Sequence, residues 1–151
     1  MWNLITTCVL ADKLRDVAPL ALRLALGAIF AWHGYDKVFV KGMPAIAGFL
    51  GSLGFPMPQV FAYILGYGEL IFGLLLVFGL LTALSARFML IIALVAFFTV
   101  HMGNGFAVSS GGYEFIVLIG AAALSLTVSG AGKYSLDAVW MAKKEETGTM
   151  M

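Results

Sequence analysis

The chain has 151 residues, of which 62% are hydrophobic and only 11% are charged, and its formal net charge is +1. A soluble domain typically carries about 25% charged residues, so this composition excludes an ordinary soluble protein and indicates an integral membrane protein. A net charge this close to zero gives no sign of nucleic-acid binding. At this length we expect a single membrane domain over residues 1–151.

Four apolar segments are predicted to span the membrane, because a spanning helix needs about 20 mostly apolar residues. They are expected at residues 17–39, 58–81, 85–101 and 113–128, followed by a tail over 129–151. The runs are continuously apolar rather than alternating, which argues against a transmembrane β-barrel. The predicted fold class is therefore all-α, a transmembrane four-helix bundle.

The first connection, "MPAIAGFLGSLGFP", is apolar but too short to cross the bilayer. Prolines stand near its start, at Pro44, and at its end, at Pro56. We interpret it as a short interfacial or re-entrant helix between the first two spans. The connection "GNGFAVSSGG", residues 103–112, has the composition of a loop.

Lys and Arg are distributed unevenly between the two ends of the predicted spans. One side would hold Lys13, Arg15, Arg87, Lys133, Lys143 and Lys144, and the other Lys37 and Lys41. The positive-inside rule then predicts a multi-pass protein with both termini, and the 129–151 tail, in the cytoplasm. The single cysteine, Cys8, excludes an intrachain disulfide.

Glu69 lies near the middle of the second predicted span, "FAYILGYGELIFGLLLVFGLL". At about 1.5 Å per residue it would sit roughly 15 Å below the bilayer boundary. A charge at that depth is costly, so an acid there usually faces the bundle interior and serves a function. A purely structural hydrogen bond between helices remains the alternative.

Every other predicted span also contributes polar side chains. On the first span, His33 and Lys37 are four residues apart and would share a face, while Arg23 lies about 10 Å from Glu69 in depth. His101 ends the third span and Glu114 begins the fourth. Each of these side chains could instead have a purely structural role. The histidines could lie at the membrane interface, Lys37 at a solvated helix end, Arg23 could snorkel to the surface, and Glu114 could cap a helix.

Two glycines, Gly66 and Gly73, flank Glu69 on its own helix face, and Gly27, Ala31 and Gly34 form a stripe on the first span. Small residues of this kind usually let helices approach closely, and they could also pair protomers in a homo-oligomer. Alternatively, the two glycines beside the acid leave room there for a flat ring or a water.

Three kinds of function remain open from these residues. A midplane acid near histidine and lysine can exchange protons while a quinone or another small redox molecule reacts. The same acid could couple protons to the export of a small molecule, and a non-catalytic scaffold for a soluble oxidoreductase would need no acid. A metal site is not favoured because the ligand spacing is absent, and a haem held by His33 and His101 is not favoured either.

The ordered motifs "RLALGAIFAWHGYDKVF", "GYGELIFGLLLVFGLLTALSAR", "VHMGNG" and "GAGKYSLD" resemble the DoxX family over roughly residues 20–137. The resemblance implies a four-helix bundle in the bacterial inner membrane and a link to redox metabolism. Some members look like subunits of thiosulfate:quinone oxidoreductase, and others are tied to oxidative-stress or thiol-handling complexes.

On the quinone-linked branch of that family, Glu69 and Arg23 are expected to form an inner proton-handling pair. His33, Lys37 and His101 would form the outer part of the pocket, with Gly66, Gly73 and Glu114 also in contact with the bound molecule. Because the chain has no separate soluble domain, any sulfur substrate or electron acceptor would need a soluble or membrane redox partner protein.

Overall fold

The computed structural model describes residues 15–148, and these residues form an all-helical fold, as predicted. Cys8, Lys13 and the last residues of the tail lie outside the described part of the chain. The helices are α3 (Val17–Tyr35), α4 (Met43–Ser52), α5 (Pro58–Phe78), α6 (Thr82–Ala96), α7 (Glu114–Ser129) and α8 (Leu136–Gly148). Two π-helical segments, η1 (Asp36–Lys41) and η2 (Phe97–His101), extend α3 and α6, and two short 3₁₀ turns, η3 (Met102–Asn104) and η4 (Val108–Ser110), follow.

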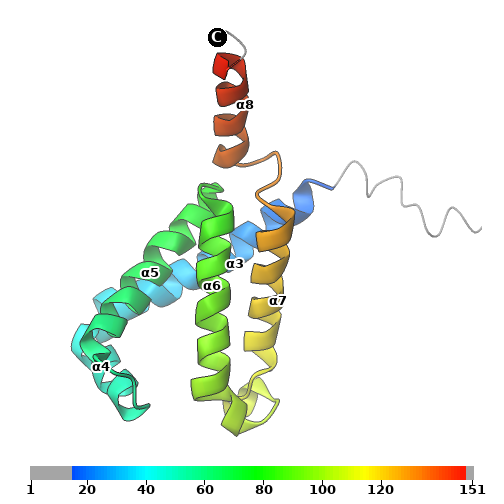
Figure 1. Cartoon of the computed structure of the whole chain (residues 1–151). Coiled ribbons are helices and arrows are strands. Elements are labelled where there is room, and N and C mark those ends of the chain that lie inside the picture. The colour runs from blue at the N-terminus through cyan, green and yellow to red at the C-terminus, as the bar shows by residue number, and fades with distance from the viewer. Residues whose placement is uncertain (1–14, 149–151) are drawn as a thin grey trace, which may run out of the picture.

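Three helical stretches in this part of the chain are long and apolar enough to cross a membrane, whereas four spans were predicted. They are Val17–Lys41, Pro58–Phe78 and Thr82–Asn104. The fourth apolar helix, α7, has only 16 residues and lies alongside α6 (Figure 1). The predicted short helix after the first span is confirmed as α4, which packs on α5.

The closest helix pair is α3 with α5, because glycines let their backbones touch. A Cβ added at Gly34 would overlap the backbone nitrogen of Leu70, and one added at Gly73 would overlap that of Ala31. The other pair is α6 with α7. Between the pairs lies a core in which Leu76, Met89, Ala123 and Leu126 are completely buried.

The α5–α6 turn is displaced from the predicted boundaries. The second span was expected to continue to residue 81, but α5 ends at Phe78 because Gly79 takes a left-handed conformation, with φ of 68°. The N–H of Leu80 bonds to Leu75 O and that of Gly79 to Leu76 O, which is a Schellman motif. The third span was expected to begin at residue 85, but α6 begins at Thr82.

The start of α6 depends on a residue from the far end of the chain. The Asp137 carboxylate accepts hydrogen bonds from the backbone N–H groups of Leu81 and Thr82, both at 2.8 Å. Ser135 Oγ accepts from Ala138 N–H and so caps α8. Beyond this cap the chain forms α8, which lies at the opposite end of the bundle from α4 (Figure 1).

Candidate functional site

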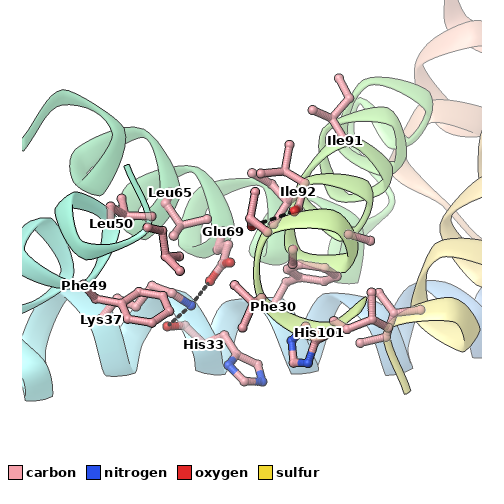
Figure 2. A pocket seen from close by; sticks show the side chains of 18 of the residues that line it. Phe30, His33, Lys37, Phe49, Leu50, Leu65, Glu69, Ile91, Ile92 and His101 are labelled. Atoms are coloured by element: carbon pink, nitrogen blue, oxygen red, sulfur yellow. Dashed lines mark hydrogen bonds and ion pairs between the residues drawn. The ribbon is translucent and has the colours of Figure 1, made fainter. Parts of the chain in front are cut away.

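A cavity of about 590 Å³ lies between the α3–α5 pair with α4 and the α6–α7 pair. We call it the groove. It lies at the end of the bundle that carries α4 and the 102–113 connection. Its walls are mostly apolar and include Phe30 of α3, Leu50 of α4 and Ile92 of α6. Figure 2 shows these side chains around a small set of polar ones. A mostly apolar pocket with a few convergent polar groups is typical of a small-molecule site.

Glu69 faces the groove from α5, and its side chain is only 5% exposed. Phe61 and Leu65 line the groove eight and four residues earlier, so the three side chains share one helix face. Lys37 Nζ donates a hydrogen bond of 2.6 Å to Glu69 Oε2 (Figure 2). The prediction that this acid points inward and meets a basic group is confirmed.

The cation that meets the acid is Lys37, which also lines the groove and is 18% exposed. Its ammonium also lies 3.5 Å from the backbone oxygen of His33, at the limit for a hydrogen bond. The pair is charge-compensated, and Glu69 Oε1 has no hydrogen-bond partner among the described residues. That oxygen can therefore accept a hydrogen bond from a molecule in the groove.

Histidines lie on both sides of the groove. His101 Nδ1 lies 2.7 Å from Gly111 O, and a carbonyl oxygen can only accept, so Nδ1 carries the proton. In the neutral ring Nε2 is then a free acceptor. His33 also lines the groove, and its ring has no hydrogen-bond partner in the described part of the chain. Both rings can bond to a ligand (Figure 2).

Two of the four ionisable groove residues stand on π-helical segments, Lys37 on η1 and His101 on η2. Such turns are rare and occur frequently at functional sites. The expectation that His33 and Lys37 share a helix face is confirmed, because both line the groove. No sequence pattern that we recognise predicts these turns.

Toward the α5–α6 turn the groove ends at the ring of Phe88, which packs against a second aromatic ring. Phe72 of α5 and Phe88 of α6 have centroids 4.6 Å apart. The Phe88 ring rests where a Cβ on Gly68 would stand, so the glycine lets this ring fit against α5. The polar residues are thus separated from the other end of the bundle by apolar side chains.

Arg23 does not meet Glu69, and the prediction of an inner Glu69–Arg23 pair is wrong. The guanidinium is fully buried at the other end of the bundle, where it donates to the backbone oxygens of Val77 and Tyr134. Val77 O is one of the last carbonyls of α5, which have no partner within the helix. Arg23 therefore joins the end of α5 to the segment before α8.

Three further predicted residues lie outside the groove. The expected room beside Gly66 and Gly73 is filled: a Cβ on Gly66 would lie 2.8 Å from Met43 Cε, and Gly73 is packed on α3. Glu114 Oε1 accepts a 2.9 Å hydrogen bond from Val108 N–H and so ties the 102–113 connection to α7. None of the three lines the groove. They pack helices or hold the connection.

The predicted residues that converge are thus Glu69, Lys37, His33 and His101. Within residues 15–148, no three His, Cys, Asp or Glu side chains lie close enough together to hold a metal ion. The arrangement offers one compensated acid and two imidazoles along a mostly apolar groove, with His33 exposed at its edge, which suits proton exchange with an uncharged molecule.

A sequence model of the family described as DoxX matches residues 18–102, which include every helix that lines the groove except α7. The chain belongs to the DoxX family. Glu69, Lys37, His33 and His101 all lie within the matched range, whereas Asp137 and the whole of α8 lie beyond it.

Curated relatives match this DoxX protein along most of their length. An uncharacterized protein of Haemophilus influenzae is 41% identical over 131 residues, which cover 83% of the chain and 87% of the relative. The Bacillus subtilis protein named "Putative oxidoreductase CatD" is 32% identical, covering 83% and 89%. The Escherichia coli "Inner membrane protein YqjF" is 30% identical, covering 83% and 93%. No solved structure matches significantly.

The apolar walls of the groove in this DoxX protein were not predicted from the sequence. Phe61 and Leu65 carried a usable signal, because they precede Glu69 at four-residue spacing. Phe49 and Leu50 of α4 carried none, since only the fold brings α4 against α5.

Proposed function

We propose that this DoxX protein binds a quinone in the groove and serves as the membrane subunit of a quinone-linked oxidoreductase. The observation that carries the proposal is the Lys37–Glu69 pair in an apolar groove, near a His101 Nε2 that has no hydrogen-bond partner among the described residues. A quinone ring is flat and apolar, with carbonyl oxygens that accept hydrogen bonds and become hydroxyl donors on reduction. The groove offers a donor in Lys37 and acceptors in Glu69 Oε1 and His101 Nε2.

The proposed reaction is the oxidation of two thiols by the quinone. Formation of a disulfide from two thiols releases two electrons and two protons, and the quinone takes up both as its two carbonyl oxygens become hydroxyls. The thiols belong to a soluble or membrane partner protein, because the only cysteine of this chain is Cys8. Glu69 and Lys37 exchange the protons with the bound ring.

The proposed location is the bacterial inner membrane, with both termini in the cytoplasm. One relative, named as an inner membrane protein, supports this location. Another, named as a putative oxidoreductase, supports the proposed activity. The excess of basic residues near the α5–α6 turn and the tail supports the orientation. The groove would then face the outer half of the bilayer.

The direct test is quinone binding by the purified protein in lipid nanodiscs, with wild type compared with Glu69→Gln. The variant keeps the size of the side chain but removes the charge that holds Lys37. A hydrogen bond to a charged group contributes about 1.5–3 kcal/mol, so we expect affinity to fall about tenfold or more. Unchanged binding by the variant removes the assignment.

Glu114→Gln is the matched control. Glu114 lies outside the groove, and a glutamine oxygen can still accept from Val108 N–H, so binding should be unchanged. If wild type binds no quinone but binds a small cation that protons displace, the groove belongs to a proton-coupled transporter instead. If it binds neither but still captures a soluble oxidoreductase, the chain is a scaffold.

A further inference from the structure

The groove has a rim on the lipid-facing surface of the bundle, between α5 and α6. Ile64 of α5 and Ile91 of α6 both line the groove, and they are also 49% and 59% exposed. Val95, one turn beyond Ile91, is likewise both a lining and an exposed residue. Exposed apolar side chains on spanning helices face acyl chains, so on this side the groove opens onto the bilayer interior.

Much of the rest of the groove is walled by protein, although Phe49, Val108 and Phe115 also line it and are 49%, 55% and 40% exposed. Toward the α5–α6 turn, Phe88 lines the groove and packs against Phe72. The 102–113 connection covers the opposite end, where Gly112 N–H bonds to Ala107 O and Tyr113 N–H to Gly105 O. Phe30 and Ile119, both buried in the core between the helix pairs, form part of the inner wall.

On the α6 side, the opening lies about as far from the α5–α6 turn as the acid does. Glu69 is nine residues before the end of α5 at Phe78, and Ile91 is nine residues after the start of α6 at Thr82. Since both helices leave the same turn, each residue lies about 14 Å from it along its helix. A molecule whose polar end meets Lys37 and Glu69 therefore lies about as far from the α5–α6 turn as Ile91, and its apolar part can extend past that side chain.

We infer that the groove takes its ligand sideways from the bilayer, between Ile64 and Ile91, and that this ligand is a quinone carrying a long apolar tail that stays in the opening. This inference rests on the proposed function and adds the ligand class and its route. The polar head is held by side chains at the far side of the groove, and the tail lies among the apolar residues of the rim and the surrounding acyl chains.

The test compares two ligands in nanodiscs: decyl-ubiquinone and the same substituted benzoquinone ring without the decyl tail. Ile91→Trp fills the opening, and Leu94→Trp is the control, because Leu94 is on the same helix and 50% exposed but does not line the groove. We expect Ile91→Trp to weaken decyl-ubiquinone binding at least fivefold relative to Leu94→Trp, with affinity for the tail-free ring unchanged. Ile64→Trp, compared with the off-groove variant Ile71→Trp, repeats the test from α5.

The outcomes separate the two proposals. If wild type binds neither quinone, the proposed function fails. If wild type binds quinone but the tryptophans at the rim change neither affinity, or lower both equally, the sideways route is overturned while the proposed function stands. Thermal unfolding of all four variants identifies any that fail to fold, and the two rim positions, on different helices, keep the test decisive if one does.

Discussion

Lys37 Nζ and Glu69 Oε2 lie 2.6 Å apart and join the end of α3 to the middle of α5. The contact lies close to the point where these helices approach most closely, because Lys37 is three residues after Gly34 and Glu69 is next to Leu70. The glycine thus sets the helix spacing at which a lysine on a π-helical turn reaches the acid. A buried acid with such a partner can stay charged in an apolar groove.

This pairing predicts a thermodynamic coupling between the two side chains. Removing one partner leaves the other charge uncompensated, so Lys37→Met and Glu69→Leu should each destabilise the protein. The double variant should cost less than the sum of the two. Because Lys37 is 18% exposed, we expect a coupling on the order of 1–2 kcal/mol. Unfolding by sodium dodecyl sulfate in mixed micelles, followed by circular dichroism, measures it.

The Lys41–Asp36 pair on η1 is the control for this cycle. It has the same 2.6 Å separation, but its side chains are 60% and 24% exposed. Exposed pairs typically contribute about 0–1 kcal/mol, so Asp36→Asn and Lys41→Met should be nearly additive. Additive effects at Lys37 and Glu69 as well would contradict a compensated pair.

Replacing Arg23 should lower the stability of the protein without weakening ligand binding. Its guanidinium donates to the backbone oxygens of Val77 and Tyr134. A lysine is a single point charge and cannot replace the planar fork of donors, so Arg23→Lys should lower the melting temperature. Quinone affinity should stay within about twofold of wild type, because Arg23 is not among the groove residues. A tenfold fall in quinone affinity at unchanged stability would show that Arg23 belongs to the ligand-binding site.

Composition and depth along the helices predicted much of the site. Glu69, Lys37, His33 and His101 were all singled out because polar groups are rare in spanning helices, and all four line the groove. The partner of the acid was predicted wrongly. The family resemblance implied a Glu69–Arg23 pair although the two lie about 10 Å apart in depth, and Arg23 bonds to the end of α5 instead.

The helix boundaries show a second limit of sequence reasoning. Gly79 could have ended α5 at the right place, since glycine commonly terminates helices. The start of α6 could not be read locally, because the group that caps it, Asp137, is 55 residues away from Thr82. The motif "GAGKYSLD" of the family resemblance contains Ser135 and Asp137 but does not show that one caps α8 and the other α6.

Replacing Asp137 should therefore destabilise the bundle at the end where α6 begins. Asp137→Ala removes both acceptors for the N–H groups of Leu81 and Thr82, and loss of a helix cap costs about 1–2 kcal/mol. Asp137→Asn keeps one acceptor oxygen and should cost less. The control is Asp16→Ala, which breaks an exposed 3.0 Å pair with Lys133 and should cost under about 0.5 kcal/mol. Equal melting temperatures for Asp137→Ala and Asp16→Ala would contradict the capping role.

Replacing Gly34 should have the strongest combined effect on the stability of the protein and on quinone binding. An alanine Cβ at this position would overlap the backbone of Leu70, which cannot turn aside as a side chain could. The two helices must separate, and overpacking of this kind costs about 1–3 kcal/mol. Separation also moves Lys37 away from Glu69, so Gly34→Ala should weaken quinone binding as well as lower the melting temperature.

The matched control is Gly48→Ala on α4. A Cβ at Gly48 meets nothing within 4 Å, and alanine favours a helix over glycine by about 1 kcal/mol. We expect Gly48→Ala to be neutral or slightly stabilising, with quinone affinity unchanged. Both variants are compared by thermal unfolding and by quinone titration in the same nanodiscs. If Gly34→Ala matched Gly48→Ala in both measurements, the α3–α5 contact would not set the spacing of the Lys37–Glu69 pair.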